Sequence, residues 1–104
     1  MKYYLCKYNS TYVSNFDVSG FFITNEEELK WKKHYLEKEF NEQGWIDYDV
    51  GTNETIEYSS LEQIYDDYSF IEITEKEYNI LVRLFPKKFF GVIGPLGEYI
   101  GNPL

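Results

Sequence analysis

The chain has 104 residues, the size of a single domain, and 20% of them are aromatic, which supplies enough core to exclude wholesale disorder. Its formal net charge of -8 argues against direct binding to nucleic acid or anionic lipid, because both need a basic surface. A lone cysteine excludes an internal disulfide and no apolar stretch approaches membrane-spanning length, so we expect one cytoplasmic domain over residues 1–104 with no membrane partner.

The N-terminal part is predicted to form strands followed by a long helix. Short aromatic strands are expected at 2–8, 11–16 and 21–23. Thr24 is a residue type that favours a helix N-cap, and Glu27 stands three positions later, which is the spacing of a capping box. The helix should therefore run over 25–42 and end at Gly44.

The middle of the chain predicts a hairpin and a short helix. The alternating segment 45–50 and the returning segment 54–58 flank a three-residue turn at 51–53. Ser60 is then expected to cap a helix over 61–68, whose apolar residues recur at helical spacing.

The C-terminal third predicts a strand, a helix and a second, shorter strand. The strand at 70–73 leads into a helix whose capping box is Thr74 and Glu77. A strand at 88–93 and an irregular tail at 94–104 follow. The mixed order of elements predicts an α+β fold: a small, mostly antiparallel sheet of about four to six strands with two main helices and one short helix.

One block of the chain is acidic throughout. Residues 39–75 contain eleven Asp and Glu and no Lys or Arg, so the rest of the chain is net positive. Like charges collected on one folded surface repel one another and weaken the compact state. The block therefore indicates a surface that meets a basic partner, and an ordinary solvated acidic face is the alternative explanation.

The predicted turn gathers several of these acids on one face of the hairpin. A three-residue turn puts Trp45 and Asp47 on the same face as Asp49 and Glu57, and apolar residues on the other face. Joined to strand 70–73 in one sheet, this face would form a carboxylate surface, with acids spaced about 6.8 Å apart along each strand. Acids on the outer side of the short helix extend it. The predicted acidic contacts are Asp47, Asp49, Glu57, Asp66 and Asp67.

Aromatic residues on the first helix are the predicted apolar contacts. On a helical wheel Trp31 and Tyr35 lie opposite the expected core stripe, which consists of Leu29, Leu36 and Phe40. An exposed Trp and Tyr among acids have the composition of a binding hot spot, and cover by a terminal segment is the alternative. Trp45 on the hairpin is the third predicted anchor.

The last helix is apolar nearly all round. One face would pack on the sheet, and Ile80 and Leu84 lie on the other face. We expect the C-terminal tail to cover this second face, and a homodimer through it is the alternative.

Residue types that carry catalysis are scarce. The acidic hairpin superficially resembles a calcium loop, but Thr52 and Tyr58 stand where that loop needs Gly and Glu. His34, the single histidine, is expected on the surface, and Cys6 is expected to be packed. We therefore expect no enzyme, no catalytic residue, no metal and no cofactor, with a small metal-dependent enzyme as the minor alternative.

The composition favours residues with AT-rich codons, as in a low-GC bacterium or its phage. In size, acidity and composition the chain resembles the small proteins of phages and mobile elements that neutralise a nuclease, such as anti-CRISPR and toxin-immunity proteins. That resemblance implies a nucleic-acid mimic, an inhibitor that occupies the basic nucleic-acid-binding or catalytic groove of a partner protein. The alternative is a structural or regulatory subunit that binds through the apolar last helix, with the acids serving solubility.

Overall fold

A computed structural model describes residues 1–10, 18–49, 54–86, 89–91 and 94–98. The fold is α+β, as predicted, and the strands pair antiparallel throughout the described residues. The elements in chain order are β1 (Tyr3–Ser10), β2 (Val18–Asn25), α1 (Glu26–Gln43), β3 (Trp45–Asp49), β4 (Glu54–Tyr58), α2 (Leu61–Asp66), β5 (Tyr68–Ile73), α3 (Glu75–Leu84), β6 (Phe89–Gly91) and α4 (Gly94–Glu98). The strand predicted at 11–16 and the turn predicted at 51–53 lie outside the described residues.

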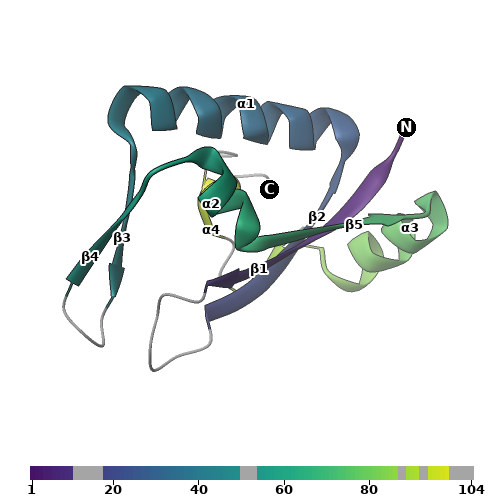
Figure 1. The fold of residues 1–104 in the computed structure, drawn as a ribbon. Coiled ribbons are helices and arrows are strands. Elements are labelled where there is room, and N and C mark those ends of the chain that lie inside the picture. Colours follow the sequence, from purple (N-terminus) through teal and green to yellow (C-terminus); the bar gives the residue numbers. More distant parts are fainter. Residues whose placement is uncertain (11–17, 50–53, 87–88, 92–93, 99–104) are drawn as a thin grey trace.

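The strands form two separate sheets. One has the order β5-β1-β2-β6, and the other is the β3–β4 hairpin. The long helix α1 crosses one face of the larger sheet, the hairpin extends from one end of the molecule, and α3 lies at the other end (Figure 1). The molecule is therefore elongated, with extents of 42 × 30 × 22 Å.

The core lies between α1 and the larger sheet. Residues two apart on a strand share a face, so Cys6 and Tyr8 of β1 both belong to the face below α1. They form one buried cluster with Phe22 of β2 and with Leu29 and Leu36 of α1. The core stripe predicted for the first helix is confirmed.

The start of α1 differs from the prediction by one residue. Asn25, not Thr24, is the N-cap, because the Asn25 Oδ1 accepts a hydrogen bond from the Glu28 backbone N–H at 2.9 Å. Thr24 belongs to β2, where its side chain is fully buried and its hydroxyl donates to the Glu28 carboxylate at 3.0 Å. Gly44 ends the helix as predicted, with a φ of 71° that glycine adopts readily, and its N–H donates to the Phe40 carbonyl.

The predicted capping box of α3 is present. The Thr74 hydroxyl accepts from the Glu77 N–H at 3.1 Å, and the Glu77 carboxylate accepts from the Thr74 N–H at 2.9 Å. One face of α3 packs on the sheet, where the Tyr78 ring lies 4.5 Å from that of Tyr3.

The segment 94–98 was predicted to be irregular but forms the short helix α4. A long-range contact fixes it: Leu96 is fully buried, and its N–H donates to the Tyr68 hydroxyl at 2.8 Å. Gly94 enters this helix at a φ of 66°, and a Cβ there would approach the Tyr8 ring to 2.7 Å. Because α4 packs against α1, this part of the tail does not cover the outer face of α3 as predicted.

Candidate partner-binding surface

The hairpin that carries the predicted acids has a different register from the predicted one. Trp45 pairs with Tyr58, and Ile46 pairs with Glu57. The prediction assumed a three-residue turn, whereas the paired strands enclose four residues, 50–53. A register shift of one residue moves every side chain of one strand to the opposite face relative to its partner.

The acids of the hairpin therefore belong to both of its faces. In the backbone register Glu57 pairs with Ile46, which is 62% exposed, and not with Asp47 or Asp49, which alternate with Ile46 along β3. The side chains of Asp47 and Asp49 lie outside the described part of the structure. The predicted single face that unites Asp47, Asp49 and Glu57 is wrong. Its predicted extension onto β5 is also wrong, because β5 belongs to the other sheet.

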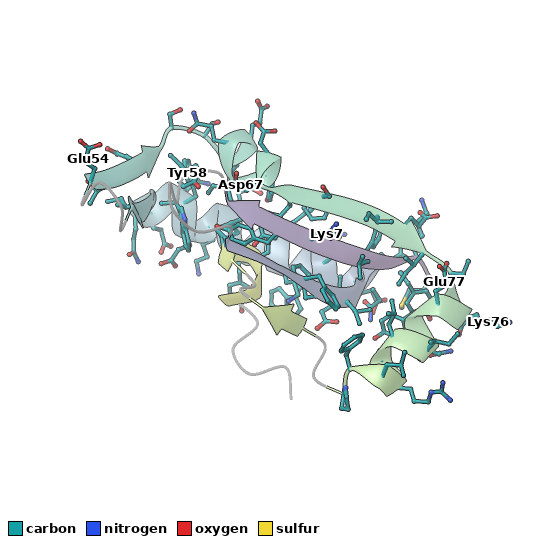
Figure 2. All side chains as sticks on the ribbon, turned by 90° about the horizontal axis from the view of Figure 1, so that it is seen from below. Lys7, Glu54, Tyr58, Asp67, Lys76 and Glu77 are labelled. Carbon is teal, nitrogen blue, oxygen red and sulfur yellow. The ribbon has the colours of Figure 1, made fainter. Side chains whose placement is uncertain are left out.

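The acids instead gather at one end of the molecule. We call residues 39–67 the acidic end; they comprise the last turn of α1, the hairpin and α2, which lie on the opposite side of the molecule from α3 in Figure 1. Figure 2 shows Glu54 of the hairpin and Lys76 of α3 at opposite ends of the molecule. The exposed carboxylates of the acidic end are Glu42, Glu54, Glu57, Glu62 and Asp66.

The described cations do not neutralise the acidic end. No lysine or arginine in the described ranges lies within 4 Å of those five carboxylates. Two lysines of α1 are turned onto aromatic rings: the Nζ atoms of Lys32 and Lys33 lie 4.4 Å from the ring centres of Phe22 and Phe70. Cation–π contacts of this kind hold each ammonium over the sheet. These two ammonium groups therefore lie over aromatic rings and not against the five described carboxylates.

Asp67 does not belong to the exposed set. It is only 9% exposed, and the Tyr58 hydroxyl donates a hydrogen bond to its Oδ2 at 2.9 Å (Figure 2). This bond joins the end of β4 to the residue that caps α2. The predicted outward position of Asp67 is wrong, because α2 ends at Asp66 and the next side chain turns inward. Asp66 itself is exposed, as predicted.

Trp31 and Tyr35 are exposed on the outer face of α1, as predicted. Their exposed fractions are 58% and 41%, and their ring centres are 4.6 Å apart. The His34 ring centre lies 6.1 Å from that of Trp31, so His34 joins this aromatic cluster. The sequence predicted only that His34 is on the surface, although positions i, i+3 and i+4 are helical neighbours. A surface depression of about 310 Å³ beside Trp31 is also lined by Glu27, Lys30 and His34.

Trp45, the third predicted anchor, has a different environment. It is half-buried and packs against the core, and its backbone pairs with Tyr58 at the base of the hairpin. The Trp45 ring therefore helps to hold the hairpin against the core, whereas the rings of Trp31 and Tyr35 are exposed. A role for Trp45 in partner binding stays a prediction.

Cys6 is packed, as predicted. It is fully buried, and desolvation raises the pKa of its thiol to about 12, although the nearby Lys32 and Lys33 act in the opposite direction. A thiol is a nucleophile only as the thiolate, so Cys6 is inert at neutral pH. Within the described ranges, no three His, Cys, Asp or Glu side chains are placed to hold a metal ion.

Comparison with known proteins does not identify this chain: no protein-family model, curated protein or solved structure matches it. In the part of the chain that the structure describes, no helix combines the length and apolar character needed to cross a bilayer. The surface features that bear on function are therefore the acidic end and the exposed aromatic cluster.

Proposed function

We propose that the protein is a non-enzymatic cytoplasmic inhibitor that inserts its acidic end into the basic nucleic-acid-binding or catalytic groove of a partner, such as a nuclease. One observation carries this proposal: exposed carboxylates collect at one end of a 42 Å molecule with no described cation within ion-pair distance. That length is several times the Debye length of about 8 Å at physiological salt, so a partner would meet the two ends as distinct electrostatic surfaces.

The hairpin register supports insertion into a groove rather than contact with a flat surface. Glu54 and Glu57 are exposed and stand three positions apart on β4, so they belong to opposite faces of this two-stranded ribbon. Such a ribbon offers negative charge to both walls of a groove, as a nucleic-acid strand does. Acids two positions apart on a strand are spaced about 6.8 Å, comparable to successive phosphates. The long-range attraction would also accelerate association.

The outer face of α1 adds an apolar contact next to this charge. Tyr35 and Glu42 are seven residues apart and therefore lie on the same side of the helix, which leads from the aromatic cluster towards the acidic end. Trp and Tyr are the residue types that most often dominate binding energy when they become buried at an interface. In this proposal Trp31 and Tyr35 provide affinity, and the acidic end provides the rate and direction of approach.

Capture with matched charge variants tests the proposal. The unaltered chain serves as bait in a lysate of a low-GC bacterium, beside Glu54→Lys/Glu57→Lys and Glu26→Lys/Glu75→Lys. All four residues are exposed, and both double variants change the net charge equally, but only the first pair lies in the acidic end. We expect a basic nucleic-acid-binding protein to be retained by the unaltered chain and the second variant and lost by the first. Equal retention by both variants would contradict the proposal.

A second candidate function follows from the outer face of α3. Ile80 and Leu84 are 40% and 59% exposed, and none of the described residues buries them. This supports the alternative of a structural or regulatory subunit that binds through α3. Such a complex should survive high salt and the Glu54→Lys/Glu57→Lys change, and it should be lost with Ile80→Ser/Leu84→Ser. The opposite pattern is expected for binding through the acidic end.

A further inference from the structure

The larger sheet has two edges that differ in length. At one edge β6 is only three residues long, which limits its capacity to pair with another strand. At the other edge β5 pairs with β1 over six consecutive residues without a bulge, and no described strand pairs with its outer side. β5 contains no Lys and no Pro, the residues that commonly protect an edge. Its backbone is therefore suited to continue the sheet.

We propose that two copies of this chain pair antiparallel through β5, around a two-fold axis at Ile71, so that their larger sheets become continuous. Symmetric dimers use the same surface patch on both copies, and an unprotected edge strand is such a patch. Ile71 is 43% exposed on this strand, although it is a large apolar residue. Its position on the axis would cover it with the same residue of the second copy.

The side chains of β5 select this register. A two-fold axis perpendicular to the sheet puts the same face of both copies on the same side. Each residue then pairs with a residue of the second copy that is an even number of positions away in the sequence, or with itself on the axis. An axis at Ile71 sets Phe70 opposite the second copy's Glu72, which avoids a pair of like charges. An axis at Glu72 would set two carboxylates against each other, which is unfavourable. The Glu72 carboxylate is also 3.8 Å from the Lys2 ammonium of its own chain, so it adds little net charge to the seam.

Antiparallel pairing also separates the two acidic ends. β5 begins after α2 and ends before α3, and Figure 2 shows Asp67 and Lys76 near its opposite ends. The acidic end of one copy therefore lies beside α3 of the other. The charges of α3 balance, with Lys76 and Arg83 against two glutamates, so each acidic end meets a helix of no net charge rather than a second acidic end. Two chains of net charge -8 can then associate without direct contact between their most negative parts.

A site-specific disulfide tests the register. In Ile71→Cys the two new thiols would face each other across the axis, with Cα atoms about 4.5–5.5 Å apart, which is within disulfide range. In the control Ser69→Cys, on the same face of the strand, the two thiols would be about 14 Å apart along the strands. Under mild oxidation we expect covalent dimers of Ile71→Cys to form at least about tenfold faster than those of Ser69→Cys. Equal rates, or no dimer from either variant, would overturn the proposal.

Sedimentation velocity separates this dimer from one built on α3. The unaltered chain should sediment as a dimer at high micromolar concentration, Ile71→Lys as a monomer, and Ile80→Ser/Leu84→Ser still as a dimer. Circular dichroism shows whether each variant is folded, and the disulfide test does not depend on Ile71→Lys. A monomeric unaltered chain, or a dimer lost only in the α3 variant, would contradict pairing through β5. Neither result bears on the partner captured by the acidic end, so the two proposals fail independently.

Discussion

Asp66→Ala and Asp67→Ala change adjacent residues but should affect the stability of the fold differently: Asp67→Ala should lower it, and Asp66→Ala should leave it almost unchanged. Asp67 accepts a hydrogen bond from the Tyr58 hydroxyl at 2.9 Å, and both side chains are buried. Asp66 is exposed at the last residue of α2, where the helix dipole disfavours an anion. The two variants have the same change in charge and differ by one position, so they separate a structural acid from a surface acid.

The magnitude follows from that hydrogen bond. A hydrogen bond to a charged group contributes about 1.5–3 kcal/mol when it is buried. At about 2.1 cal/mol/K per residue, the unfolding entropy of a chain of this length is about 0.2 kcal/mol/K, so Asp67→Ala should lower the Tm by about 7–14 °C. For Asp66→Ala we expect a change within about 0.5 kcal/mol, or about 2 °C, because it removes only an unfavourable dipole interaction.

Thermal unfolding followed by far-ultraviolet circular dichroism measures both changes. Amide hydrogen exchange adds a local readout, because the bond ties β4 to α2 and its loss should accelerate exchange in the hairpin before the larger sheet. Equal Tm values for the two variants would refute the assignment of Asp67 to the interior. So would a larger loss in Asp66→Ala.

Three further predictions concern single residues. The Cys6 thiol, with its pKa raised to about 12 by burial, should not react with Ellman's reagent in the folded protein at pH 8 and should react fully in denaturant; rapid labelling of the native chain would contradict its burial. Asn25→Ala should cost about 1 kcal/mol by urea titration, because it removes the N-cap acceptor of α1, and an unchanged midpoint would restore Thr24 as the cap. Hydrogen bonds from Thr74, chiefly from its backbone N–H, hold the pKa of the Glu77 carboxyl below its ordinary value. The ionised carboxylate therefore stabilises the fold above the unfolded-state pKa, and this stabilisation is lost as the pH falls through the lower pKa of the folded state. The unaltered chain should therefore lose more stability than Glu77→Gln between neutral and acid pH, and equal losses would refute this.

The sequence predicted best the features that depend on neighbouring residues. The capping box of Thr74 and Glu77 and the C-terminal Gly44 are local signals, because the partners in each motif are three or four residues apart. The exposure of Trp31 and the burial of Leu36 followed from helical periodicity in the same way.

The predictions that failed depend on the length of the hairpin connection or on contacts between residues farther apart in the sequence. One additional residue between the paired strands of the hairpin moved Glu57 to the face opposite Asp47, and no propensity distinguishes a three-residue connection from a four-residue one here. Asp67 turns inward because its carboxylate accepts a hydrogen bond from the Tyr58 hydroxyl, nine residues away. Helix α4 forms because the Leu96 N–H donates to the Tyr68 hydroxyl, 28 residues away. The run of acids is visible in the sequence, whereas its division between the two faces of the hairpin and its separation from β5 required coordinates.

The most direct test of the central claim is the association rate of the captured partner with the two double variants at low and high salt. At low salt, Glu54→Lys/Glu57→Lys should slow association by about tenfold or more, because it reverses charge at the end that guides the approach. Glu26→Lys/Glu75→Lys, with the same net charge, should change the rate much less, and high salt should remove the difference because it screens exposed charges. Equal rates for the two variants at low salt would show that the acidic end does not meet the partner.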